Sequence, residues 1–234
     1  MSRLGQCVVF FNFLVFMIGC DTAGEGAAQI QIGSANEVSS IQGLQYQQPL
    51  VVQVTDLDGN PVAGASVSVR VVPVEYFKGI YIRIDANGLP AALLADAVRW
   101  GSLISAYCPT EDLNDNAVLD AGEDINGNVV LDPSHPATLT PHASALPTLD
   151  PISNRILTDD SGFGYFSITY PESVASWVAV RIIASTRVLG TESTQTMEVD
   201  LLAPLPDLEE VDIAPPGGST ESPYGVANVC TDAN

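Results

Sequence analysis

Positive charge is scarce in this sequence. Lysine and arginine together number 8 against 28 aspartates and glutamates, so the formal net charge at pH 7 is −20. Phosphate backbones and anionic lipid surfaces repel so acidic a chain, which argues against a nucleic-acid partner. The single lysine, Lys78, is as readily a surface charge as a functional group. No lysine or arginine lies between Arg99 and Arg155. Because carboxylates are frequent there, we expect a mobile cation to neutralise them.

The usual catalytic signatures are also missing. The chain has no GxSxG elbow, no HExxH, no P-loop and no GxGxxG after a predicted strand. Its two histidines, His135 and His142, lie in a proline-rich segment at a spacing that fits no standard zinc site. Carboxylate pairs are abundant, but no aromatic platform accompanies them. We therefore expect a protein that is not an enzyme, with hydrolysis of an extracellular polymer as the remote alternative.

The most regular feature is a repeat of twelve residues within EDLNDNAVLDAGEDINGNVVLD, residues 111–132. A twelve-residue loop can wrap a calcium ion by presenting oxygen donors at positions 1, 3, 5, 7, 9 and 12. In the first loop the predicted ligands are Asp112, Asn114, Asn116, the carbonyl of Val118, Asp120 and Glu123. In the second loop they are Asp124, Asn126, Asn128, the carbonyl of Val130 and Asp132.

The second loop departs from this pattern at two positions. Its position 12 is His135, and imidazole suits zinc or copper better than calcium. Position 6, where a sharp turn favours glycine, is Ala117 in the first loop and Val129 in the second. A β-branched residue there predicts a distorted turn, although Gly127 can absorb part of the bend. We expect the first loop to bind more tightly and the second to borrow ligands or bind weakly. A solvated loop without an ion is the alternative.

The run resembles the calcium loops of EF-hands, dockerins and thrombospondin type 3 repeats. An EF-hand has a helix on each side of its loop. Here residues 103–106 are apolar and strand-like, and Pro133, Pro136 and Pro141 follow the repeat. The flanks therefore favour a helix-free calcium loop inside a β domain.

Alternating apolar and polar residues predict strands in much of the remaining chain. The period of two is clear at residues 29–32, 65–71, 80–84, 166–170 and 197–201. VQVTDLDGNPVAGASVSV (52–69) and TDDSGFGYFSITY (158–170) resemble bacterial Ig-like domains of the invasin and intimin type (Big-1). The resemblance implies an all-β, Ig-like β-sandwich over residues 29–202, interrupted by an insertion at 87–154 that carries the tandem loops 112–135.

The N-terminus has the features of a targeting segment. Arg3 precedes a short apolar run, residues 8–18, that is too brief to span a bilayer. Met17-Ile18-Gly19-Cys20 resembles the lipobox of bacterial lipoproteins. The resemblance implies a signal peptide over 1–19, lipidation of Cys20, and a flexible tether over 20–28 that anchors the protein to a membrane. A plain secretory signal with an incidental cysteine is the alternative.

Residues 203–234 form an extended tail rich in proline, glycine and acidic residues that alone would be disordered. If Cys7 leaves with the signal and Cys20 is lipidated, two cysteines remain in an oxidising compartment. We predict a disulfide between Cys108 and Cys230, against the alternative of two free thiols.

Together these features predict a non-enzymatic, lipid-anchored, extracytoplasmic Ig-like module that calcium stabilises. Its role would be structural or adhesive, with a protein or a glycan as partner. The alternative is an accessory subunit of a secretion or pilus apparatus, at the periplasmic side or the surface of a bacterium.

Overall fold

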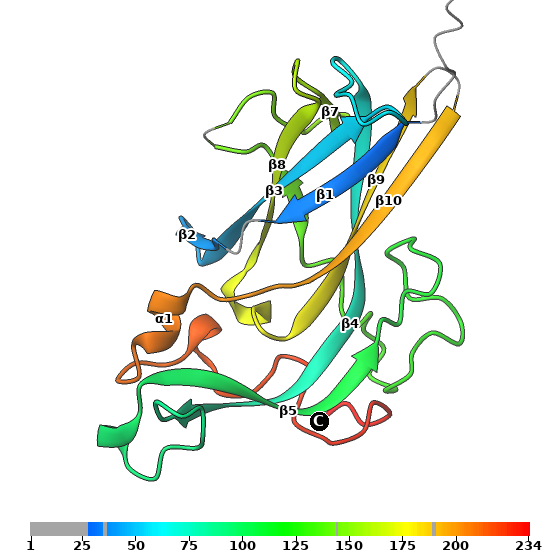
Figure 1. The fold of residues 1–234 in the computed structure, drawn as a ribbon. Coiled ribbons are helices and arrows are strands. Elements are labelled where there is room, and N and C mark those ends of the chain that lie inside the picture. Colours follow the sequence, from blue (N-terminus) through cyan, green and yellow to red (C-terminus); the bar gives the residue numbers. More distant parts are fainter. Residues whose placement is uncertain (1–27, 35–36, 144, 189–190) are drawn as a thin grey trace, which may run out of the picture.

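Two antiparallel sheets pack against each other in the computed structural model, which describes residues 28–34, 37–143, 145–188 and 191–234 (Figure 1). The first sheet has the order β1–β3–β8–β6, with β2 also paired to β3: β1 (Gln29–Ser34), β2 (Ser39–Ile41), β3 (Gln45–Thr55), β6 (Thr138–Thr140) and β8 (Phe163–Pro171). The second has the order β10–β9–β4–β5, with β7 also paired to β4: β4 (Ser66–Ile84), β5 (Arg99–Pro109), β7 (Arg155–Leu157), β9 (Val178–Val188) and β10 (Thr191–Asp200). The predicted all-β sandwich is confirmed.

Alternate side chains of the strands fill the space between the sheets. In β3 every second residue from Tyr46 to Val54 is buried, because successive side chains of a strand point to opposite faces. The opposing sheet contributes buried side chains at the same period: Val67, Val69, Val178, Val180 and Ile182. Trp177 is fully enclosed and packs edge-on against Tyr81, with ring centroids 4.9 Å apart. The period of two thus predicted the strands and most of their inward faces, but not at residues 80–84, where Tyr81 is buried and Ile80 is exposed.

β4 is long enough to pair with different neighbours along its length. Its first part pairs with β9 from Val67 to Tyr76, and its last part pairs with β5 from Glu75 to Ile84. The ladder between β4 and β5 shifts register at Lys78 and Gly79. Residues 87–154 therefore do more than interrupt the sandwich, since they contribute β5 to one sheet and β6 to the other.

The C-terminal tail is ordered because it packs back onto β4. It contains α1 (Leu205–Glu209) and the 3-10 helix η3 (Pro216–Gly218); two further short 3-10 helices are η1 (Leu94–Asp96) and η2 (Glu172–Val174). Beyond η3, the Ser222 amide donates to the Gly79 carbonyl, and the Gly79 amide donates to the Gly225 carbonyl. Tyr224 lies against Tyr76 with ring centroids 4.9 Å apart.

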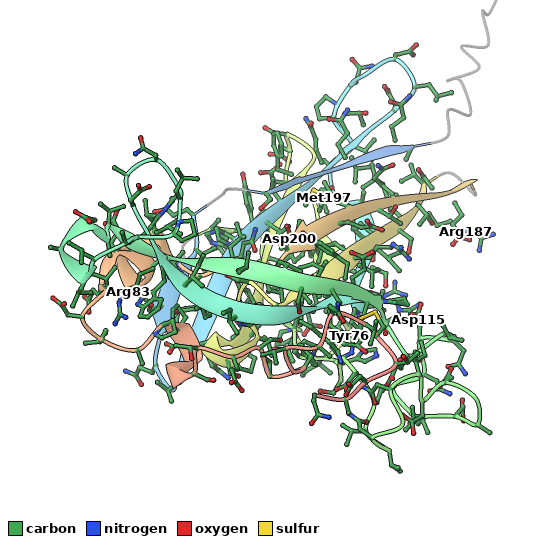
Figure 2. All side chains as sticks on the ribbon, turned by 90° about the horizontal axis from the view of Figure 1, so that it is seen from below. Tyr76, Arg83, Asp115, Arg187, Met197 and Asp200 are labelled. Atoms are coloured by element: carbon green, nitrogen blue, oxygen red, sulfur yellow. A yellow bond between two sulfur atoms is a disulfide. The ribbon has the colours of Figure 1, made fainter. Side chains whose placement is uncertain are left out.

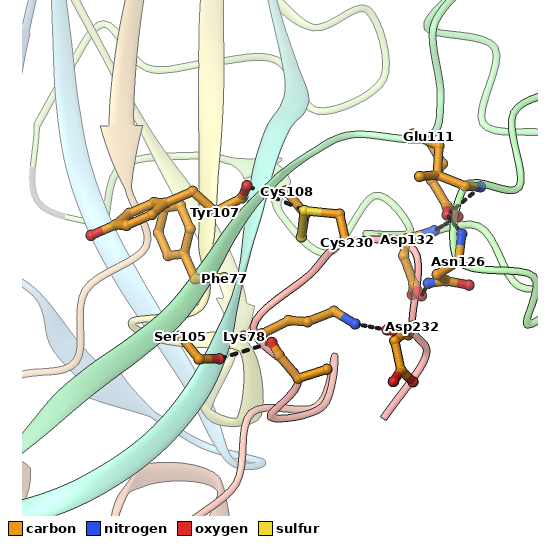
Figure 3. Close-up of a disulfide and its surroundings, with 12 residues drawn as sticks. Phe77, Lys78, Ser105, Tyr107, Cys108, Glu111, Asn126, Asp132, Cys230 and Asp232 are labelled. Carbon is orange, nitrogen blue, oxygen red and sulfur yellow. Dashed lines mark hydrogen bonds between the residues drawn. A yellow bond between two sulfur atoms is a disulfide. The ribbon is translucent and has the colours of Figure 1, made fainter.

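A disulfide between Cys108 and Cys230 ties the tail to β5 (Figure 3), with the two Cα atoms 5.5 Å apart. The predicted pairing is confirmed. The bond spans a sequence separation of 122 residues, and closing so long a loop in the unfolded chain stabilises the fold by about 5 kcal/mol in the chain-entropy model. Next to it, Lys78 is fully buried and donates a hydrogen bond to the backbone carbonyl of Asp232. Of the two interpretations left open for Lys78, the surface charge is wrong, because the tail covers this side chain.

Among the residues that the structure describes, no helix has the length and apolar character needed to span a bilayer. The predicted signal peptide, Cys20 and the tether up to residue 27 lie outside the described residues.

Candidate metal centre

The acidic repeat forms two consecutive loops between β5 and β6. We call residues 112–123 loop 1 and residues 124–135 loop 2. The whole segment 110–137 contains turns and bends but no helix or strand. This agrees with the expectation of a helix-free loop inside a β domain.

Side-chain oxygens organise the backbone of loop 1. The two carboxylate oxygens of Asp112 accept hydrogen bonds from the amides of Asn116 at 3.0 Å and Ala117 at 2.8 Å. Asn114 Oδ1 accepts from the Asn116 amide at 3.1 Å, and Asn116 Oδ1 accepts from the Val118 amide at 2.7 Å. Since a carbonyl oxygen has two lone pairs, each asparagine oxygen keeps one for a further interaction.

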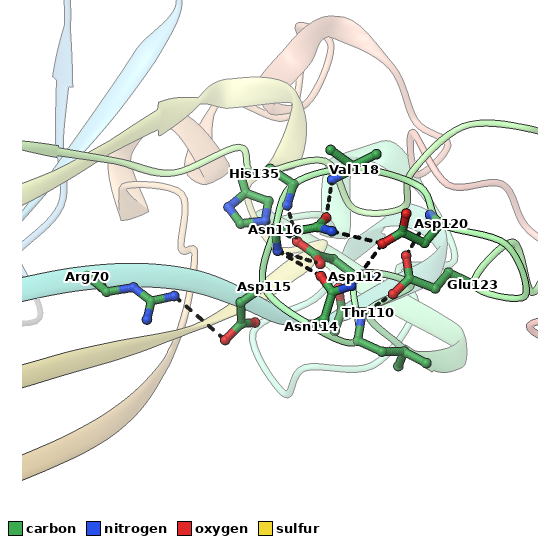
Figure 4. Close-up of polar contacts among 12 residues, drawn as sticks. Arg70, Thr110, Asp112, Asn114, Asp115, Asn116, Val118, Asp120, Glu123 and His135 are labelled. Carbon is green, nitrogen blue, oxygen red and sulfur yellow. Dashed lines mark hydrogen bonds and ion pairs between the residues drawn. The ribbon is translucent and has the colours of Figure 1, made fainter.

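Asp120 connects the far side of loop 1 to the two asparagines. Its Oδ2 atom accepts hydrogen bonds from the side-chain amides of Asn114 at 2.9 Å and Asn116 at 2.8 Å (Figure 4). The predicted side-chain ligands Asp112, Asn114, Asn116 and Asp120 thus belong to one hydrogen-bonded network.

Loop 2 repeats this network at the equivalent positions. Asp124 accepts from the amides of Asn128 at 3.1 Å and Val129 at 3.2 Å. Asp132 Oδ2 accepts from the side-chain amides of Asn126 at 2.9 Å and Asn128 at 2.8 Å. Asn126 Oδ1 and Asn128 Oδ1 accept from the amides two residues on, as in loop 1. The two loops therefore share one hydrogen-bonding pattern despite their different position 12.

The turn at position 6 requires a left-handed backbone in both loops. Ala117 has φ of 61° and Val129 has φ of 62°. Position 4 is also left-handed, at Asp115 with φ of 58° and Gly127 with φ of 74°. Gly127 therefore takes part in the bend, as predicted, but does not remove the unfavourable conformation of Val129. A β-branched residue there costs about 1–2 kcal/mol.

A buried glutamate closes each loop. In loop 1, Glu123 Oε1 accepts from the Leu113 amide at 3.1 Å and Oε2 accepts from the Asp120 amide at 2.8 Å. In loop 2 the same two positions, Ile125 and Asp132, donate to Glu111 at 2.9 Å and 3.0 Å. Each glutamate stands directly before the aspartate that opens one loop, and it closes the other loop.

Sequence reasoning missed Glu111. From the second loop's own position 12 we expected no closing carboxylate, whereas Glu111 supplies one from ahead of loop 1. The signal was present, because Glu111 precedes Glu123 by one full period of twelve residues. The match was overlooked because each loop was counted from its first aspartate, which leaves Glu111 outside both loops.

His135, at position 12 of loop 2, contacts loop 1 instead. Its Nε2 atom lies 2.7 Å from Asp112 Oδ2. Burial opposes ionisation of Asp112, but hydrogen bonds from His135 and from the amides of Ala117 and Asn116 outweigh burial and lower the pKa of Asp112. Asp112 is therefore held as a carboxylate.

Few cationic groups offset the negative charge of the loops. His135 is one such group. In the described part of the loops, a second ion pair joins Arg70 of β4 to Asp115 of loop 1 at 3.8 Å, and both side chains are largely exposed. The buried carboxylates Glu111 and Glu123 are held by backbone amides and not by a basic side chain. Burying a carboxylate without a compensating charge is costly.

A buried tyrosine lies beneath loop 2. The Tyr76 hydroxyl, on β4 (Figure 2), is enclosed and lies against the side chain of Asn126. Burial raises the pKa of Tyr76 to about 12, the Asn126 side chain lowers it, and the charges of Glu111 and Asp132 raise it further. All three of these neighbours belong to the network of loop 2.

The donor set fits a hard divalent cation. It consists of carboxylate and amide oxygens, which calcium prefers, whereas zinc and copper favour nitrogen and sulfur. The described residues include no group of three or more His, Cys, Asp or Glu side chains arranged to hold a metal. An ion in either loop would therefore depend on asparagine and backbone oxygens as well as carboxylates.

Comparisons with known proteins assign no family. No family model and no curated protein matches the chain. Among solved structures, a crystal structure of MtrC from Shewanella baltica OS185 aligns with 75% of this chain and 22% of its own, at 14% identity and a TM-score of 0.22. This chain thus spans less than a quarter of that structure, and the likeness is too weak to indicate a shared fold.

Proposed function

We propose that the chain is a non-catalytic, lipid-anchored β-sandwich of the bacterial Ig-like kind that lies outside the cytoplasm and is stiffened by calcium in residues 111–135. The observation that carries this proposal is the duplicated, oxygen-lined loop with no lysine or arginine in its sequence. Its carboxylates are Glu111, Asp112, Asp115, Asp120, Glu123, Asp124 and Asp132.

Calcium is the cation that this donor set favours. The ligands are all oxygen, and the loops have the irregular backbone that calcium's flexible coordination tolerates better than the strict octahedron of magnesium. An ion that binds only the ordered loop stabilises the fold by about 2.7 kcal/mol when its concentration is a hundred times its Kd. That energy offsets the conformational entropy lost by a segment without secondary structure.

Three features favour a location outside the cytoplasm. The Cys108–Cys230 disulfide is of the kind that persists in oxidising compartments. Cys20 stands in a lipobox-like context, and several acyl chains on it would anchor the protein stably. The net charge of −20 fits a soluble face in a salt-rich medium.

The role of such a module would be structural or adhesive, with a protein or glycan as partner. A groove of about 450 Å³ runs beside loop 1, and its walls include Arg70, Asp115 and His135. Because residues of loop 1 form one wall, an ion in that loop would set the shape of the groove. Partner binding would then depend on calcium.

Calorimetric titration of the full-length protein in detergent tests the calcium function. We expect binding in the sub-millimolar to millimolar range, about 10⁻⁴–10⁻³ M, as in other extracellular modules. The double variant Asp112→Ala/Glu123→Ala should lose the tighter site, whereas Asp58→Ala, an exposed carboxylate in another turn, should bind as the wild type does. Unchanged affinity in the double variant would show that the ligand assignment is wrong.

Fractionation tests the anchoring. The wild-type protein should sediment with membranes and Cys20→Ser should be soluble. Wild-type protein found only in the soluble fraction would contradict lipid anchoring, and protease added to intact cells would separate surface from periplasmic exposure.

A further inference from the structure

We propose that a hollow on the outer face of the second sheet, between Arg155 and Arg187, binds an anionic polysaccharide through the carboxylate or sulfate groups of its sugars. The inference rests on the adhesive role proposed above and deepens it, because it names the class of partner and the residues that hold it. Residues of β4, β7, β9 and β10 line this arginine hollow, and residues of the calcium loops do not.

Positive charge gathers on this face although the chain as a whole carries −20. Half of the chain's 8 basic residues lie there: Arg70 on β4, Arg155 on β7, and Arg181 and Arg187 on β9. They point away from the core because the residue that precedes or follows each of them along its strand is buried. Figure 2 shows Arg187 extending clear of the sheet.

Arg155 and Arg187 are the two arginines of this face that no carboxylate neutralises. The other two form ion pairs, at 3.8 Å and 2.7 Å. Among the described residues, Arg187 has no ion pair or side-chain hydrogen bond, and Arg155 donates one hydrogen bond of 3.4 Å to Ser66. Glu192 stands opposite Arg187 in the ladder between β9 and β10 and lines the hollow without pairing with either arginine. Guanidinium groups with unused donors suit planar, bidentate binding of an anionic group.

Serine hydroxyls form the floor between the two arginines. Ser68 of β4 pairs with Ser185 of β9 on one side and with Arg155 of β7 on the other. Ser66 also lines the hollow, which has a volume of about 290 Å³. Each hydroxyl can donate one hydrogen bond and accept two, which matches the hydroxyl groups of a sugar. The described residues that line the hollow include no aromatic ring on which a sugar could stack, so charge must supply most of the affinity.

The pairing of the strands favours a polysaccharide over an acidic peptide. β4 lies between β9 and β7 here, and β9 lies between β4 and β10. The backbone beneath the hollow is therefore already hydrogen-bonded and offers no free edge to which a peptide strand could add. Distant carboxylates do not prevent the binding of an anion, because at physiological ionic strength charges are screened over about 8 Å.

The experiment measures the binding of short oligosaccharides to the full-length protein in detergent by calorimetry, at fixed calcium concentration. Heparin supplies sulfates and carboxylates, hyaluronate supplies carboxylates alone, and dextran is neutral; poly-glutamate represents an acidic peptide. Arg155→Gln and Arg187→Gln remove positive charge from the hollow, and Glu192→Gln removes its negative charge. Arg181→Gln is the matched control, because it removes an arginine from the same face outside the hollow. Near-ultraviolet circular dichroism verifies that each variant is folded.

We expect the wild type to bind heparin or hyaluronate and not dextran. Arg155→Gln and Arg187→Gln should each weaken this binding about tenfold, as expected for the loss of a charged hydrogen bond. Glu192→Gln should strengthen it by about twofold to fivefold, because a like charge beside the ligand is removed. Arg181→Gln should bind as the wild type does. A merely structural role of these exposed side chains would not produce changes of opposite sign.

An equal loss in Arg181→Gln would reveal only a general effect of charge and overturn the site, as would dextran that binds as tightly as heparin. Poly-glutamate that binds as tightly, with the same dependence on Arg155 and Arg187, would assign the hollow to an acidic peptide and overturn the choice of a sugar. A wild-type protein that binds neither heparin nor hyaluronate but is still stabilised by calcium overturns this inference alone. Sugar binding that persists in a protein without any response to calcium overturns the calcium function instead.

Discussion

Replacement of Val129 by asparagine should stabilise the protein, although it introduces a polar residue. Val129 has φ of 62° and its side chain is 80% exposed. The left-handed conformation costs a β-branched residue about 1–2 kcal/mol, whereas asparagine tolerates it well. Little apolar burial is lost, so we expect a gain of about 1 kcal/mol in the free energy of unfolding. For a domain of this size that gain raises Tm by about 2–4 °C.

The assay is thermal unfolding in a calcium chelator, followed by circular dichroism. Val130→Asn is the matched control, because Val130 is 55% exposed and does not have a positive φ; its Tm should stay within about 1 °C of the wild type. Val129→Gly should gain less than Val129→Asn, since glycine adds about 0.4–1 kcal/mol of unfolded-state entropy. A Tm for Val129→Asn equal to or below the wild-type value would refute the left-handed turn at position 6.

Three further predictions concern the disulfide, a close backbone approach and pH. Cys230→Ser should lower the free energy of unfolding by up to about 5 kcal/mol and free the tail for proteolysis; an unchanged urea midpoint contradicts this. Gly79→Ala should destabilise by roughly 2 kcal/mol or more, because φ is +149° and a Cβ would collide with a backbone carbonyl of β5, whereas Gly88→Ala meets open space and should cost less. Hydrogen bonds, chiefly from neighbouring side chains, lower the pKa of Asp56 and Asp150. Their stabilisation is present above the unfolded pKa, about 3.9, and is lost as pH falls through the lower folded pKa. The urea midpoint measured in chelator should therefore decrease as the pH is lowered below this value. The decrease should be less steep in the double variant Asp56→Asn/Asp150→Asn.

The strands were predictable because a half-buried strand repeats every two residues. Val52 and Val54, or Val67 and Val69, show that repeat without any tertiary knowledge. The disulfide was predictable from the number of cysteines. Once Cys7 was assigned to the signal peptide and Cys20 to lipidation, Cys108 and Cys230 were the two that remained. Both inferences depend on local spacing or on chemistry that any fold must satisfy.

The missed features all depend on tertiary contacts. Lys78 is buried because a tail more than a hundred residues later covers it, and no local pattern predicts that. β5 belongs to the second sheet because β4 continues past its bulge, whereas the sequence indicated a strand-like stretch at 103–106 within an insertion and not its place in the sheet. Glu111 closes a loop that begins thirteen residues later. The twelve-residue spacing to Glu123 hinted at this role, and the contacts of Glu111 with loop 2 establish it.

Calorimetric melting of the full-length protein, with calcium removed by chelator and with calcium at about a hundred times its Kd, tests most directly whether these loops hold an ion. One ion of this kind adds about 2.7 kcal/mol, which corresponds to a rise in Tm of about 5–11 °C, and a second ion adds a similar amount. Magnesium should produce a much smaller rise. Equal melting temperatures and identical circular dichroism in both samples would contradict the account and leave the acidic loops as a solvated surface.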